Sequence, residues 1–146
     1  MSPEIPESFL DLVQGPRVAA LTTLMPDGQP QTTVVWCDFD GRYVRVNTMR
    51  GFRKEKNMRL DPRVTLLCYD PRQPLRSLEV RGRVIEMTEE AALEHLDGLC
   101  QLYTGRRPYF GACVPAELKE TETPVLCRIL PLRVTALDAR KKESAL

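Results

Sequence analysis

Tight-turn sequences divide the first third of the chain into short stretches of apolar and β-branched residues. A Pro-Asp-Gly turn at residues 26–28 separates residues 17–24 from residues 31–39, and an Asp-Gly turn at residues 40–41 separates the latter from residues 43–48. Turns of this kind between β-type stretches are typical of hairpins, so the three stretches predict an antiparallel meander. A chain that begins in this way is constrained to a fold built on an antiparallel sheet.

Three further strands are expected at residues 64–69, 77–87 and 124–137, where apolar residues run together or alternate with polar ones. Pro131 lies inside the last stretch, which is typical of an edge strand or a bend. Six strands, mostly connected by hairpins, are too few for a sandwich and favour a small barrel, whose closure removes exposed sheet edges.

Two helices complete the expected fold. Residues 52–60 have the composition of a short basic helix that ends before Pro62. Residues 88–103 predict a longer amphipathic helix with Thr88 as its N-cap, whereas residues 106–123 show no regular pattern. The sequence therefore predicts a mainly β (α+β) fold in a single domain over residues 1–146.

Composition excludes several classes of protein. The chain is 42% hydrophobic and 28% charged with a net charge of +1, which is the balance of a globular protein without an overall attraction to nucleic acid or membranes. No apolar run approaches the roughly 18 residues of a membrane span, and the N-terminus is acidic where a signal peptide would be basic. We therefore expect a cytoplasmic protein.

The cysteines and the single histidine point away from metal and nucleophilic chemistry. The five cysteines lack the close spacing of zinc or thioredoxin-like sites, so we expect them to be reduced and mostly buried. His95 is interpreted as a surface or boundary residue of the long helix. We expect no catalytic acid, base or nucleophile and no metal, and a cofactor would then supply the chemistry.

A basic segment between Met49 and Arg63 contains six bases against two acids. A helix start after Gly51 offers backbone N–H groups, and Arg53 and Lys54 add two cations, so this segment predicts a phosphate site. The alternative is a solvated basic helix face. A nucleic-acid site is disfavoured because only one short element is basic and no aromatic platform accompanies it.

Residues 31–67 carry an ordered set of motifs: VVWCDFDGRYVRVNT, then GFRK, then EKNMRLDPRVTLL. This set resembles the cofactor-binding half of the pyridoxamine 5'-phosphate oxidase-like family, and the resemblance covers roughly residues 8–105. It implies a six-stranded antiparallel split β-barrel that forms a homodimer, with a flavin-type cofactor in a groove between the subunits.

The resemblance also implies a set of cofactor-binding residues. The strand up to Trp36 would lie along the ring and ribityl chain, the next strand end and the Arg-Lys pair would hold the ribityl and phosphate groups, and Ser77 would reach the cofactor of the partner subunit. The implied residues are Thr32, Thr33, Val34, Val35, Trp36, Asn47, Thr48, Arg53, Lys54, Asn57 and Ser77.

The C-terminal third lacks the Arg-x-His element of the true oxidases, so vitamin B6 oxidation is disfavoured. The chain is more similar to the branch that uses the deazaflavin F420, through residues 33–36, 54–57 and 59–64. The acidic tail of F420 would suit Arg50, Lys56 and Arg59. This resemblance implies an F420-dependent reductase that transfers hydride to a small unsaturated substrate. The alternatives are an FMN-dependent oxidoreductase and a non-catalytic cofactor-binding protein.

Overall fold

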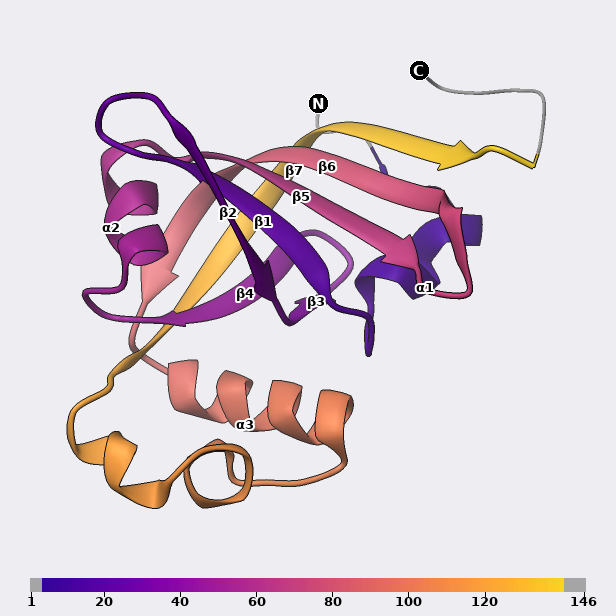
Figure 1. The fold of residues 1–146 in the computed structure, drawn as a ribbon. Coiled ribbons are helices and arrows are strands. Elements are labelled where there is room, and N and C mark those ends of the chain that lie inside the picture. Colours follow the sequence, from indigo (N-terminus) through magenta and orange to yellow (C-terminus); the bar gives the residue numbers. More distant parts are fainter. Residues whose placement is uncertain (1–3, 141–146) are drawn as a thin grey trace.

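In a computed structural model, which describes residues 4–140, the chain forms one antiparallel sheet of seven strands in the order β2-β1-β5-β6-β7-β4-β3 (Figure 1). The expected hairpins and the later strands are confirmed, with ends that differ by a few residues. The strands are β1 (Ala19–Leu24), β2 (Pro30–Val35), β3 (Cys37–Phe39), β4 (Val44–Met49), β5 (Arg63–Asp70), β6 (Gln73–Thr88) and β7 (Pro124–Asp138).

The seventh strand arises because the stretch expected as one strand over residues 31–39 is two strands. β2 ends at Val35, β3 begins at Cys37, and Trp36 lies between them. β2 pairs with β1 at one edge of the sheet, whereas β3 pairs with β4 at the other edge. The two edge strands are therefore consecutive in the chain, and the sheet must curl to let one residue connect them. This arrangement confirms the split β-barrel.

The long strands β6 and β7 share a bend at Gly82, where their register shifts. A Cβ atom at Gly82 would lie 2.6 Å from Ile129 Cγ2 and 2.7 Å from the carbonyl oxygen of Leu130, so no side chain fits there. Pro131 is the partner of Gly82 in this register. Because β7 lies between β6 and β4, Pro131 marks a bend and not an edge strand.

The long helix begins later than the sequence predicts. Thr88 is the last residue of β6, and its hydroxyl accepts a hydrogen bond from the Glu90 N–H at 3.1 Å, so it does not cap the helix. The predicted short helix is confirmed, and short turns at the N-terminus and within residues 106–123 were not expected. The helical segments are η1 (Glu7–Phe9), α1 (Leu10–Val13), α2 (Arg53–Leu60), α3 (Ala92–Thr104), η2 (Tyr109–Cys113) and η3 (Ala116–Glu120).

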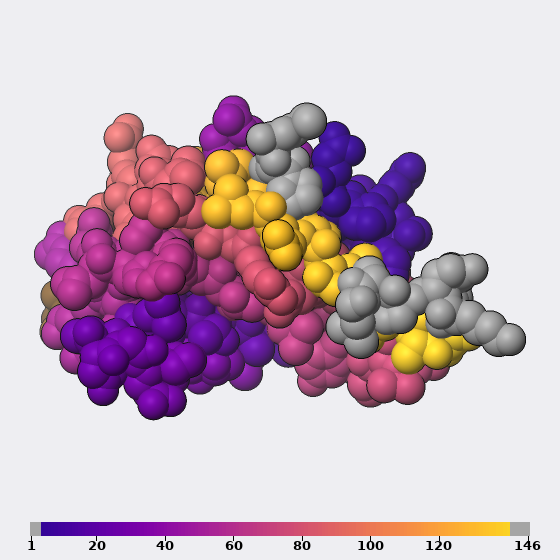
Figure 2. All heavy atoms as spheres, turned by 90° about the horizontal axis from the view of Figure 1, so that it is seen from above, coloured from indigo at the N-terminus to yellow at the C-terminus, as the bar shows by residue number. Residues whose placement is uncertain are grey.

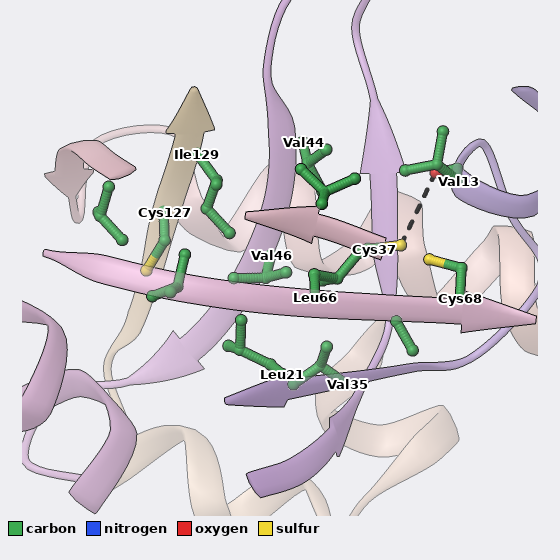
Figure 3. Close-up of a cluster of buried hydrophobic side chains, with 14 of the residues drawn as sticks. Val13, Leu21, Val35, Cys37, Val44, Val46, Leu66, Cys68, Cys127 and Ile129 are labelled. Atoms are coloured by element: carbon green, nitrogen blue, oxygen red, sulfur yellow. Dashed lines mark hydrogen bonds between the residues drawn. The ribbon is translucent and has the colours of Figure 1, made fainter. Parts of the chain in front are cut away.

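Buried aliphatic side chains and cysteines fill the barrel (Figure 3). The sulfur atoms of Cys37 and Cys68 point toward one another, and the Cys37 thiol donates to the carbonyl oxygen of Val13 at 3.7 Å. Cys37, Cys68 and Cys127 are free and buried, as expected. The expectation is wrong for Cys100 and Cys113, which form a disulfide. Their separation of 13 residues carried no signal, since only the fold of the chain after α3 brings them together.

Only one side of the barrel is covered by the long helix. α3 packs outside β4 and β7, and a second apolar cluster lies beneath it around Met49, Leu96 and Phe110. Seen from the side opposite α3, β6 in pink and β7 in yellow lie at the surface (Figure 2). Within residues 4–140, no helix is long and apolar enough to cross a membrane.

Candidate functional site

A cavity of about 250 Å³ lies beside the connection between the two edge strands, and we call it the Trp36 cavity. β2 and Trp36 form one wall, the end of β4 and the start of α2 another, and α3 and Tyr109 a third. The lining residues are Val34, Val35, Trp36, Asn47, Thr48, Met49, Phe52, Lys54, Leu96, Leu99 and Tyr109.

The structure brings together six of the residues that were predicted from the sequence to bind the cofactor. They come from three separate elements, and the cavity is where these elements meet. The six residues are Val34, Val35, Trp36, Asn47, Thr48 and Lys54.

The other five predicted residues do not line the cavity, and their roles in cofactor binding stay predictions. The Thr32 hydroxyl is exposed and lies 2.8 Å from the Thr22 hydroxyl. Arg53 is exposed at the start of α2. Thr33 is half-buried in β2. Ser77 lies in β6, which is separated from β2 in the sheet by β1 and β5.

Asn57 is buried, and its side-chain nitrogen forms hydrogen bonds inside the protein. It is 1% exposed, and its Nδ2 donates to Thr23 Oγ1 at 3.1 Å and to Gln31 Oε1 at 3.3 Å. These hydrogen bonds attach α2 to β1 and β2, so Asn57 holds the helix that carries Lys54 against the sheet.

Five residues of the cavity wall were not predicted from the sequence. Leu96 and Leu99 belong to an apolar stripe that was expected only to pack on the barrel, and Tyr109 lies in the segment without a pattern. Tyr109 meets Trp36 edge to face, with ring centroids 6.2 Å apart and planes at 87°. No local signal could identify it, because the return of the chain after α3 places it there. Met49 and Phe52 complete the wall.

A polar network lies behind Asn47 and includes His95, which was expected at the surface or at the boundary of the core. The His95 side chain is only 6% exposed, and its Nε2 lies 3.2 Å from Asp38 Oδ2. Arg45 donates to the same carboxylate from Nε at 2.8 Å and from Nη2 at 2.9 Å. His95 as a whole residue is intermediate in burial, which agrees with a boundary position. Its partner Asp38 was not expected, because the two residues lie far apart in sequence.

The charge on Asp38 follows from this network. Burial acts to raise the pKa of the Asp38 carboxyl, but the hydrogen bonds from His95 and Arg45 outweigh it, and the pKa is lowered. Asp38 is therefore an ionised acceptor at neutral pH.

Two oxygen atoms at the Trp36 cavity lack a hydrogen-bond partner within the described residues. They are Asn47 Oδ1 and Thr48 Oγ1, and both atoms are buried. Thr48 as a whole is 6% exposed. A buried polar atom without a partner costs about 1–3 kcal/mol, so these oxygens favour a ligand that supplies hydrogen-bonding groups.

Lys54 brings a positive charge to the cavity. Burial lowers the pKa of its ammonium group, and within residues 4–140 it forms no ion pair with a carboxylate. Two of the bases expected to hold an acidic tail are already paired: Arg50 with Glu89, at 2.6 Å between Nε and Oε2, and Arg59 with Glu55. Among the residues that line the cavity, the basic one is Lys54.

The family model for pyridoxamine 5'-phosphate oxidase matches residues 5–122. This chain belongs to that family. The pyridoxamine 5'-phosphate oxidase family comprises flavin-binding oxidoreductases, so the match confirms the resemblance inferred from the motifs. A search of curated proteins finds no match.

Solved structures of other proteins have the same fold. An F420 reductase is 27% identical with a TM-score of 0.77, covering 90% of this chain and 98% of its own. A conserved hypothetical protein from Mycobacterium tuberculosis is 29% identical with a TM-score of 0.73, covering 95% of this chain and 88% of its own. A putative pyridoxamine 5'-phosphate oxidase from Listeria innocua is 18% identical with a TM-score of 0.65, covering 90% and 97%, and supports the fold alone.

The residues of the Trp36 cavity fit a flavin-type group. Such a group combines a planar ring, a chain of hydroxyls and a phosphate. Trp36 offers an aromatic surface, Asn47 and Thr48 offer unpartnered oxygens, and Lys54 offers a cation. In this member of the pyridoxamine 5'-phosphate oxidase family, the three kinds of contact come from elements that the curled sheet brings to one place.

Proposed function

We propose that this protein is an F420-dependent reductase that transfers hydride to a small unsaturated substrate. The observation that carries the proposal is the meeting in one cavity of an aromatic wall, two oxygens and a lysine that have no hydrogen-bond or ion-pair partner in the described part of the chain. The likeness to an F420 reductase over 90% of the chain favours the deazaflavin.

In this proposal the bound deazaflavin supplies the hydride, and the protein binds and orients. Lys54 pairs with the phosphate, and Asn47 and Thr48 accept hydrogen bonds from ligand hydroxyl or N–H groups. Trp36 and Tyr109 shape an apolar face against which a planar substrate lies. No side chain has to act as acid, base or nucleophile, since fixing the distance and orientation of the reactants is the main contribution.

We further propose that a second copy of the chain completes the site. The cavity of about 250 Å³ is smaller than the roughly 300–1,000 Å³ of typical small-molecule sites. Two of its lining side chains, Val34 and Phe52, remain 71% and 45% exposed. Val34 pairs with Ala20, which pairs with the exposed Leu67, so an apolar row leads from the cavity across the outer sheet face. Ser77 lies on the same sheet and would reach the partner's cofactor.

The dimer is tested by sedimentation of the wild type and of Leu67→Glu, with Leu60→Glu on α2 as the control at another exposed leucine. We expect a wild-type dimer that Leu67→Glu weakens and Leu60→Glu leaves intact. A wild-type monomer with full cofactor affinity would contradict the proposal.

FMN is the second candidate cofactor, because the family is one of flavin-binding proteins and the same contacts suit a flavin phosphate. The absorption spectrum of the purified protein, followed by titration with F420 and with FMN, separates the two. The chain contains one tryptophan, and it lines the cavity, so quenching of its fluorescence reports binding at this site.

We expect a colourless protein that binds F420 more tightly than FMN. A yellow protein with a flavin spectrum would establish FMN instead. Binding of F420 without reduction of any unsaturated acceptor would favour a cofactor-binding protein, and binding of neither cofactor would refute the proposed function.

A further inference from the structure

We propose that Asp38 and His95 are positioning residues that fix the amide of Asn47, so that its oxygen and not its NH2 group is offered to the ligand. The inference rests on the proposed function, because it concerns how the same cavity recognises its cofactor. The ligand chemistry that it selects is a hydrogen-bond donor, either a hydroxyl or a ring N–H.

The orientation of the Asn47 amide follows from its neighbours. Asn47 Nδ2 lies 2.9 Å from the carbonyl oxygen of Ala92, the first residue of α3. A carbonyl oxygen can only accept a hydrogen bond, so the atom facing it must be the amide nitrogen. The second hydrogen of this NH2 group points to His95 Nδ1 at 3.1 Å, which must then accept.

The acceptor role of His95 Nδ1 fixes the rest of the imidazole. A neutral imidazole with an unprotonated Nδ1 carries its proton on Nε2. Nε2 faces Asp38 Oδ2 at 3.2 Å, and an ionised carboxylate needs a donor there. The hydrogen bonds therefore form one consistent chain. Asn47 Nδ2 donates to His95 Nδ1, and His95 Nε2 donates to the Asp38 carboxylate.

Arg45 anchors the far end of this network. Its two contacts with the Asp38 carboxylate, at 2.8 Å and 2.9 Å, form a bidentate pair that holds the carboxylate in one orientation. Asp38 lies in β3, Arg45 in β4 and His95 in α3, so three elements define the direction of one amide. The amide oxygen that remains, Asn47 Oδ1, is one of the buried atoms that lack a hydrogen-bond partner among residues 4–140.

Two substitutions of His95 separate positioning from simple packing. Asparagine places its amide oxygen one bond from Cγ, where histidine has Nδ1, so His95→Asn keeps an acceptor for Asn47. Glutamine places its amide one bond further out, where histidine has Nε2, so His95→Gln keeps a donor for Asp38 and loses the acceptor for Asn47. Glu94→Gln, at the exposed neighbouring position of α3, is the matched control.

The dissociation constants of F420 and FMN are measured through Trp36 fluorescence, and a thermal melt confirms that each variant folds. We expect His95→Gln to raise the dissociation constant about tenfold or more, the effect of one lost hydrogen bond, with His95→Asn and Glu94→Gln within about threefold of the wild type. Equal losses in His95→Asn and His95→Gln, or a larger loss in His95→Asn, would overturn the inference.

A second measurement does not depend on a ligand. His95 is the only histidine, so its imidazole ¹⁵N resonances can be assigned without ambiguity. We expect the Nε2–H tautomer with Nδ1 unprotonated, and the Nδ1–H tautomer would overturn the inference. If the wild type binds neither cofactor, the proposed function fails by itself, and the tautomer alone decides whether Asp38 and His95 orient Asn47.

Discussion

The indole of Trp36 stacks on the phenol ring of Tyr103, with ring centroids 5.2 Å apart and planes 16° apart. The Tyr103 hydroxyl accepts a hydrogen bond from the Cys37 N–H at 3.0 Å and lies 2.7 Å from the carbonyl oxygen of Arg17, to which it can donate. Tyr103 therefore ties α3 to the connection between the two edge strands and holds the aromatic wall of the cavity in place.

Tyr103→Phe should lower the free energy of unfolding by about 1–3 kcal/mol, because the Cys37 N–H loses its partner while the stacked ring remains. Tyr69→Phe is the control, since this tyrosine is exposed and its hydroxyl has no hydrogen bond within the described residues. Chemical denaturation measures both variants. Equal stability of the two would show that the Tyr103 hydroxyl contributes nothing.

Lys54→Ala should weaken cofactor binding by about 1.5–3 kcal/mol, the usual scale of a charge-assisted hydrogen bond. Lys56→Ala on the same helix is the control, because Lys56 is exposed and does not line the cavity. Fluorescence titration at moderate salt compares the two. A loss of the same size in Lys56→Ala would indicate general attraction by the basic helix and not a contact made by Lys54.

The affinity of the wild type should also depend on alkaline pH. Burial lowers the pKa of Lys54 from its ordinary 10.5, so the ammonium group loses its charge at a lower pH than an exposed lysine does. Cofactor binding that depends on this charge should weaken as pH rises through the lowered pKa. Titrations across the alkaline range should show this decline in the wild type and not in Lys54→Ala, and matching profiles would assign the decline to another group.

Asp38→Asn should make protein stability less sensitive to acid. The folded-state pKa of Asp38 lies below its ordinary 3.8, so its stabilising effect is complete above that value and is lost as pH falls through the lowered pKa. The charged or titratable groups facing it are Arg45 and His95. Denaturation should show a larger difference between wild type and variant at pH 6 than at pH 3, and a constant difference would exclude this linkage.

Gly82→Ala should destabilise the fold by about 1–3 kcal/mol, because the added methyl group meets Ile129 and the Leu130 backbone at the bend of β7. Gly98→Ala is the control, and it is expected to raise the free energy of unfolding. Gly98 lies in α3 with open space around it, and alanine favours a helix by about 0.5–1 kcal/mol. Thermal denaturation should order the three proteins accordingly, and a neutral Gly82→Ala would mean that β7 can shift.

Local sequence signals were sufficient for most strands and for six of the cavity residues, which lie on β2, β4 and α2 and at Trp36 between β2 and β3. Turn residues and alternation depend on neighbours in the chain, and so do the motifs around Trp36, Asn47 and Lys54. Contacts made by α3 and the segment after it depend on tertiary packing. Three features depend on tertiary packing in this way and could not be predicted from a local pattern. They are the place of Tyr109 at the cavity, the burial of the His95 side chain and the disulfide of Cys113.

Because the cavity exists only when the sheet has closed at the link between β2 and β3, ligand binding adds to the free energy of unfolding. Trp36 joins the two edges of the sheet, and the cavity beside it is walled by β2, the end of β4, α2 and α3. A ligand that binds only this closed arrangement adds about 2.7 kcal/mol to stability at a hundredfold excess over its Kd. Unfolded molecules are removed by proteases in cells, so the abundance of this protein should follow the supply of its cofactor.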